Sequence, residues 1–283
     1  MAGPLEKPMK NLQGASPSPE EKKDVPFEIR SFSLTVENLS IRGEMTSLQG
    51  SRLLPPLIVC HGIPQERQAP TARNEGYRSL ARYFARLGFL SIIFNFRGTG
   101  FSEGSFDLWG WKRDLEAVID RVLKEEKVMG QPLSLLGFSG GAATACIAAA
   151  GRPEAANIIL AACPADFEFL FDKEPAAELL EEAMSIGIMR EDDLPGDPGR
   201  WAAEQKKFRP VDYVSRISPR PLLLIHGQKD ELVVAEHAKR LLAAAEEPKE
   251  LVLLPEAPHQ LRVLPEVLDC CVWWLKKRVR VVD

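Results

Sequence analysis

A serine set between glycines is the first candidate for chemistry in this chain. Residues 137–141, Gly-Phe-Ser-Gly-Gly, follow a short apolar run and open an alanine-rich segment at 142–150. A strand, a sharp turn and a helix form the setting in which Gly-x-Ser-x-Gly exposes its serine as a nucleophile. A side chain at either outer glycine would collide with neighbouring backbone in so tight a turn. We therefore predict a nucleophilic Ser139 above a helix N-terminus, whose partial positive charge suits a developing anion.

A serine nucleophile needs a base to take its proton and a carboxylate to orient that base. Among the four histidines, His259 is best placed, because it follows the last predicted strand by a few residues. Asp230 follows the preceding strand and is the predicted acid. Glu231 competes with it from the next position. Asp212 is a weaker competitor that fits a helix cap or a surface group better.

The other histidines and one cysteine have less specific surroundings. His226 ends the strand before Asp230 and is predicted to be structural. His237 falls in a predicted helix and is expected to face solvent. His61 follows a strand directly, and we expect it to brace its loop by hydrogen bonding without acting as a base. Cys163 ends another strand and can line a pocket, but it lacks the sharp turn that a nucleophile needs.

Hydrophobic patterns predict the elements that position these residues. Alternating segments at 27–36 and 39–45 indicate an antiparallel opening hairpin. After them, apolar strands alternate with amphipathic helices, which implies a mostly parallel sheet with helices on both faces. Such sheets bind ligands at the carboxyl ends of their strands. Strands are predicted at 57–60, 89–96, 133–136, 157–162, 221–225 and 250–254, and helices at 77–87, 111–122, after Ser139, 237–245 and 264–278.

Residues 164–218 interrupt this alternation, since they contain no clear buried strand. Helices are predicted there at 176–188 and 200–207, on either side of an acidic loop. A long segment inside a compact domain is commonly a functional lid. We predict that it forms a small helical cap within a domain spanning 26–283. Aromatic residues open this segment, and they form either an acyl-binding wall or the cap's own packing (Phe167, Phe169, Leu170 and Phe171).

Composition narrows the remaining possibilities. Residues 1–25, rich in Pro, Lys, Glu and Ser, lack the apolar stretch of a secretory signal and predict a flexible arm. The five cysteines are an odd number and fit reduced core residues of a cytoplasmic protein. A net charge of -4 gives no reason to expect nucleic acid or an anionic membrane as partner. No run approaches the roughly 18 apolar residues of a membrane span, and no Cys/His spacing matches a metal site.

Two groups of residues have ordinary structural explanations. The basic stretch 276–280 ends a predicted helix, where cations offset the negative end of the dipole. Trp109 and Trp111 flank the start of another helix and are expected to pack in the core.

In their order and their positions at strand ends, these motifs resemble the α/β-hydrolase superfamily over nearly all the chain after Phe27. His-Gly-Ile-Pro at 61–64 resembles the family's oxyanion loop. The resemblance implies that the backbone N–H groups of Ile63 and Gly140 hold the tetrahedral oxyanion. Residues 97–104 look like the Arg-Gly-x-Gly-x-Ser-x-Gly loop that shapes the site in esterases, acylglycerol lipases and aminopeptidase-like members.

The resemblance implies an α/β-hydrolase fold and a serine hydrolase that cleaves carboxylic esters of small molecules through an acyl-enzyme. Ser139, His259 and Asp230 are the expected nucleophile, base and acid, with no metal or organic cofactor. A serine peptidase of the prolyl oligopeptidase or aminopeptidase type is the nearest alternative. A thioesterase or acyltransferase uses the same groups. A non-catalytic scaffold is least in keeping with an intact set of three residues.

Overall fold

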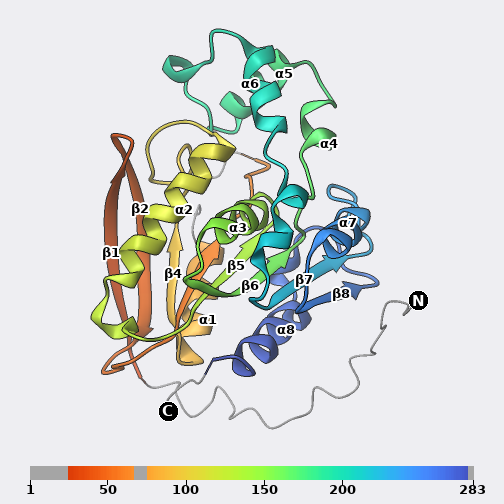
Figure 1. Ribbon diagram of the computed structural model, residues 1–283. Helices are drawn as coiled ribbons and strands as arrows, with labels where there is room; N and C mark the ends of the chain where they lie inside the picture. Colours follow the sequence, from red (N-terminus) through yellow and green to blue (C-terminus); the bar gives the residue numbers. More distant parts are fainter. Residues whose placement is uncertain (1–24, 67–74, 280–283) are drawn as a thin grey trace, which may run out of the picture.

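The computed structural model of this chain describes residues 25–66 and 75–279. Its centre is an eight-stranded sheet in the order β1-β2-β4-β3-β5-β6-β7-β8 (Figure 1). The first two strands form the predicted antiparallel hairpin, and β2 also pairs antiparallel with β4. All later neighbours pair in parallel. The strands are β1 (Phe27–Val36), β2 (Leu39–Leu48), β3 (Pro56–Cys60), β4 (Leu90–Phe94), β5 (Leu133–Phe138), β6 (Ala155–Ala161), β7 (Leu222–Gly227) and β8 (Lys249–Leu254).

Helices cover both faces of the sheet, as the sequence predicts. The reason is visible along β3, where successive side chains point to opposite faces. Leu57 and Val59 join the apolar cluster of α1 and α8, whereas Ile58 and Cys60 join that of α2, α3 and α7. These covering helices are α1 (Glu75–Arg86), α2 (Leu108–Leu123), α3 (Gly140–Gly151), α7 (Glu236–Ala244) and α8 (Pro265–Lys276), and the short 3-10 turns are η1 (Glu126–Val128), η2 (Glu191–Asp193), η3 (Pro210–Asp212), η4 (Val214–Ile217) and η5 (Leu261–Val263).

The segment between β6 and β7 carries three further helices, seen at the top of Figure 1. They are α4 (Glu168–Phe171), α5 (Ala176–Ser185) and α6 (Pro198–Lys206). Two of them lie where helices are predicted, with shifted ends. α6 begins at Pro198 because Asp197 caps it and accepts the N–H of Arg200.

Other predictions concern the chain's ends and its cysteines. All but the last residue of the predicted arm at 1–25 lie outside the described residues. The five cysteines are buried and form no disulfide. Among the described residues, no helix is both long enough and apolar enough to cross a membrane. The basic stretch begins where α8 ends, at Lys276, and its last residue also lies outside the description.

Candidate active site

Ser139 lies at the turn between β5 and α3, at the carboxyl edge of the sheet. Its backbone has φ 54° and ψ -124°, a conformation that an L-residue adopts only under constraint. The constraint is close packing on both sides. A side chain at Gly137 would meet the backbone of Ala142, and one at Gly141 would meet the carbonyl of His61. The predicted collision is confirmed, and it explains why glycine flanks the serine.

His259 and Asp230 meet Ser139 from two other strand ends. His259 lies in the loop after β8, with Nε2 3.0 Å from Ser139 Oγ. Its Nδ1 is 2.8 Å from Asp230 Oδ2, in the turn after β7. Nδ1 donates to the carboxylate, so Nε2 is free to accept the serine proton. The structure therefore brings together the three side chains that the sequence singles out.

The Asp230 side chain is fully buried, yet its surroundings favour the charged form. Oδ1 accepts the N–H groups of Leu232, at 3.1 Å, and Val233, at 2.8 Å. Burial alone raises the pKa of this carboxyl, but hydrogen bonds from His226, His259 and Val233 outweigh it and hold the pKa well below its usual range. The Asp230 carboxylate is thus ionised at neutral pH.

The loop after β3 lies directly against the serine turn. A Cβ placed on Gly62 would be 3.0 Å from Ser139 Cβ, and one on Gly140 would be 3.5 Å from the Ile63 nitrogen. Among the described residues, no acceptor takes the Ile63 N–H. The Gly140 N–H belongs to the first turn of α3, where amides lack partners within the helix. Both amides are therefore close to Ser139 and available to an oxygen atom.

His61 braces this loop, as expected from the sequence. Its Nδ1 is 2.8 Å from the Gly62 carbonyl, so Nδ1 carries the proton. Its Nε2 accepts the Phe96 N–H at 3.2 Å and lies 3.1 Å from the Thr99 hydroxyl. Burial lowers the pKa of His61 to about 4, so the ring is neutral at ordinary pH. His61 therefore joins the Gly62 peptide to the neighbouring loop.

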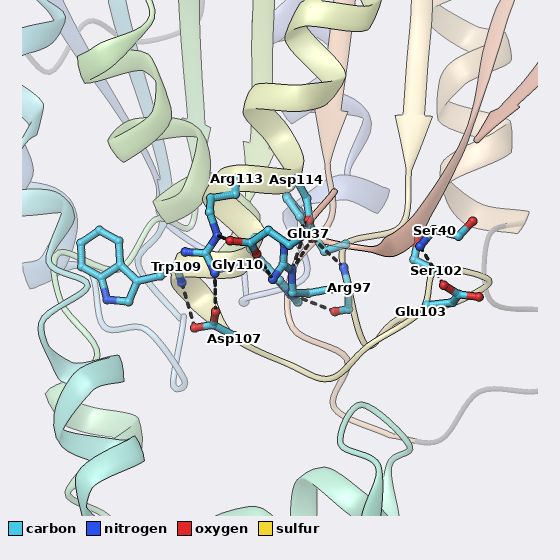
Figure 2. Close-up of polar contacts among 12 residues, drawn as sticks. Glu37, Ser40, Arg97, Ser102, Glu103, Asp107, Trp109, Gly110, Arg113 and Asp114 are labelled. Atoms are coloured by element: carbon cyan, nitrogen blue, oxygen red, sulfur yellow. Dashed lines mark hydrogen bonds and ion pairs between the residues drawn. The ribbon is translucent and has the colours of Figure 1, made fainter. Parts of the chain in front are cut away.

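That neighbouring loop, residues 97–104, is fixed by a buried ion pair. Arg97 donates to both oxygens of Asp114 through its side chain and its backbone N–H, with distances of 2.7 and 2.8 Å. Figure 2 shows Arg97 between Asp114 of α2 and Glu37 of the β1–β2 turn. Glu37 also bridges to Arg113, at 2.7 Å. The network holds the loop against both the hairpin and α2.

Residues 164–218 are attached beside this loop. The Ile188 carbonyl accepts the Phe106 N–H at 2.8 Å, and a Cβ on Gly98 would touch the same carbonyl. Gln205 of α6 is buried, and it accepts the Leu108 N–H and donates to the Asp107 carboxylate. The segment is therefore joined to the N-terminus of α2.

The aromatic residues that open this segment pack largely on one another. Phe167 is 1% exposed, and its ring contacts those of Phe169, Phe171 and Phe208. Phe169 is only partly buried and also contacts the ring of His237. Internal packing accounts for most of this cluster.

The expectation that His237 faces solvent is wrong. Its side chain is buried, and Nδ1 accepts the Ala165 N–H at 3.1 Å. The reason is its place on α7, since His237 and Leu241 share the buried face of that helix. The i, i+4 spacing to Leu241 is the sequence signal that pointed to burial.

The competing residues lie away from Ser139 or take no part in its contacts. Glu231 is exposed, and Asp212 is an exposed partner of Arg209. The Cys163 thiol is buried, which raises its pKa and disfavours a thiolate. Trp111 packs fully buried against Phe96, with its N–H on the Arg97 carbonyl, in agreement with a core position.

One residue takes a larger part than predicted. His226 reaches the Asp230 carboxylate, with Nε2 3.4 Å from Oδ2. No periodic signal in the sequence marks this contact, because it arises from how the turn after β7 closes. Across residues 25–66 and 75–279, no group of three or more His, Cys, Asp or Glu side chains is arranged to hold a metal ion.

A family model described as the alpha/beta hydrolase fold matches residues 55–186. The chain has the α/β-hydrolase fold. YfhR proteins of two Escherichia coli strains, O157:H7 and K12, are 27% identical to this chain over 207 residues. The match covers 70% of the chain and 66% of each relative, just under two thirds of their length.

Solved structures share the fold over most of this chain. GrgF of Penicillium sp. sh18 superposes with a TM-score of 0.72 at 19% identity, covering 90% of this chain and 99% of GrgF. The esterase Pf2001 of Pyrococcus furiosus gives 0.65 at 24% identity, with 90% and 95% covered. Est1E of Butyrivibrio proteoclasticus gives 0.62 at 18% identity, with 86% and 95% covered. The predicted fold is confirmed.

Proposed function

We propose that this α/β-hydrolase is a serine hydrolase that cleaves carboxylic esters of small molecules through an acyl-enzyme. The arrangement of Ser139, His259 and Asp230 carries the proposal. Distances of 3.0 and 2.8 Å join the three groups in the order that proton transfer requires. The strained backbone of Ser139 supports it, because strain persists where the surrounding structure enforces a function.

In the proposed reaction, Ser139 Oγ attacks the ester carbonyl while His259 Nε2 takes its proton. The N–H groups of Ile63 and Gly140 stabilise the resulting oxyanion. His259 then gives the proton to the departing alcohol, which leaves an acyl group on Ser139. Water activated by His259 releases the acid. Asp230, ionised throughout, holds the histidine tautomer and stabilises the imidazolium.

The proposal includes residues 164–218 as a cap beside the reacting groups. Its support is the attachment of Ile188 to the loop at 97–106, next to the oxyanion loop. Two of the structures that share the fold are named as esterases or bind an aromatic acid, Pf2001 and the complex of Est1E with ferulic acid. They make carboxylic esters the first substrate class to test.

The test is hydrolysis of p-nitrophenyl esters from acetyl to palmitoyl, with Ser139→Ala beside the wild type. Ser185→Ala is the matched control, because that exposed hydroxyl only bonds within its own helix turn. Ser139→Ala is expected to lower kcat/KM by at least about 10⁴-fold, and the control by less than about twofold. The preferred acyl length then measures the space beneath the cap.

Three results would count against this assignment. Activity that persists in Ser139→Ala removes the serine mechanism altogether. If a fluorophosphonate labels Ser139 but no ester is hydrolysed, Ser139 is still the nucleophile and the substrate is a peptide or a thioester. Absence of both hydrolysis and labelling contradicts the proposal as a whole.

A further inference from the structure

His226 contacts the turn that carries Asp230 from its buried side, opposite His259. It lies in the last part of β7 with a side chain only 1% exposed. Its Nε2 is 2.7 Å from the Val233 carbonyl. Because a carbonyl only accepts, Nε2 carries the proton and donates it. The same N–H faces Asp230 Oδ2 at 3.4 Å, which makes it a second, longer donor to that oxygen.

Two hydrogen bonds of the Val233 backbone therefore close the turn at 230–233. Val233 donates its N–H to Asp230 Oδ1 at 2.8 Å and offers its carbonyl to His226. Asp230 Oδ2 lies between two imidazoles, with His259 Nδ1 at 2.8 Å on the open side and His226 Nε2 on the buried side. Removing the His226 ring would leave the Val233 carbonyl unpaired in the interior and would free the carboxylate to rotate.

We infer that His226 is a positioning residue that fixes the Asp230 carboxylate toward His259, an inference that rests on the proposed serine hydrolase function. It acts on the reaction only through Asp230, by orienting Oδ2 and by taking up part of its charge. Without it, Oδ2 carries more charge toward His259 and stabilises the imidazolium more strongly. The base is then protonated at higher pH, and it is less well aligned with Ser139.

The other charged groups around His226 are few and largely compensated. Asp230 and His259 face it from the two loops of the site. From α7 and the segment before α4 come His237 and the ion pair of Asp166 with Arg240 at 2.5 Å. Burial lowers the pKa of His237, so this ring stays neutral where the reaction would run. The acid limb of a pH–rate profile is the fall in rate at low pH. A shift of this limb in a His226 variant therefore reports on Asp230 and His259.

The experiment measures the rate constant for fluorophosphonate labelling of Ser139 between about pH 5 and pH 9. It uses the wild type, His226→Phe and His226→Gln. Phenylalanine keeps the ring but removes the N–H, whereas glutamine places an amide N–H near the position of Nε2. His226→Phe is expected to slow labelling by about 10- to 100-fold and to move the acid limb to higher pH. In His226→Gln the acid limb is expected at the same pH as in the wild type, and the rate constant for labelling is expected within about threefold of the wild-type value.

Labelling does not depend on the choice of ester, so the two hypotheses fail separately. A wild type that is not labelled overturns the proposed function and leaves His226 nothing to position. If the wild type is labelled, and His226→Phe is labelled at the same rate with the same pH dependence, only the inference is overturned. Equal losses in both variants with an unmoved acid limb assign His226 a purely structural role and also overturn it. If His226→Phe does not fold, His226→Asn replaces it: its shorter amide misses Val233, and labelling as fast as in His226→Gln contradicts the inference.

Discussion

At the scale of single residues, Asp230 and its neighbour Glu231 offer a direct comparison. Asp230→Asn keeps the shape of the side chain but removes the charge opposite His259 Nδ1 and favours the wrong tautomer. We expect kcat on a p-nitrophenyl ester to fall by about 10⁴-fold. Glu231→Gln is the control, since that side chain is exposed, and it should change kcat by less than about twofold. A large loss of kcat in Glu231→Gln, with little change in Asp230→Asn, would instead assign the role of the acid to Glu231.

The residues of the candidate site differ in how well the sequence predicts them. Ser139, Asp230 and His259 were predictable because each follows a strand that the apolar pattern marks. The burial of His237 was signalled only by its i, i+4 spacing to Leu241, whereas its contacts with Ala165 and Phe169 depend on a distant segment. The contact of His226 with Asp230 likewise arises from how one turn closes, which hydrophobic periodicity does not report.

At the scale of elements, the Arg97–Asp114 ion pair joins the loop at 97–104 to α2. The Asp114 side chain is fully buried, and that of Arg97 is 7% exposed. Asp114→Asn leaves a buried guanidinium with only the half-exposed Glu37 as a charged partner. We expect it to lower the free energy of unfolding in urea by about 3 kcal/mol. Glu37→Gln, at the exposed end of the network, should cost less than about 1 kcal/mol.

Equal costs in the two variants would show that the buried pair has no special part in holding the loop. The elements on either side of it were predicted well, because a run rich in Ile and Phe marks β4 and an i, i+4 stripe marks α2. The pair itself was not predicted. A polar contact between a loop and a helix leaves no periodic signal in the sequence. The same is true of the hydrogen bond that Gln205 of α6 accepts from Leu108 at the start of α2.

At the scale of the whole molecule, parallel pairing is what assembles the site. β3, β5, β7 and β8 all end at the same edge of the sheet. The loop at 61–64, Ser139, Asp230 and His259 follow these four strands in turn, although Ser139 and His259 are 120 residues apart. The order of motifs predicted this gathering, whereas the attachment of residues 164–218 depends on contacts that only the fold reveals.

Global stability should depend on pH through His61, which is buried as a neutral ring. Its pKa is lowered from an ordinary 6.5 to about 4 by burial. The unfolded chain therefore binds a proton more readily, and the stabilisation present above about pH 6.5 is lost as the pH falls toward 4. Between about pH 7.5 and pH 5, His61 should account for a loss of about 2 kcal/mol.

His61→Gln removes this titration while keeping an amide that can bond within the loop. The measurement is the free energy of unfolding in urea at both pH values for the wild type and the variant. His237, whose pKa is also lowered by burial, contributes equally to both proteins and cancels in their difference. The wild type should lose about 2 kcal/mol more than the variant on acidification. Equal losses would mean that protonation of His61 costs the folded chain no stability, and so that His61 does not couple the loop at 61–64 to the stability of the fold.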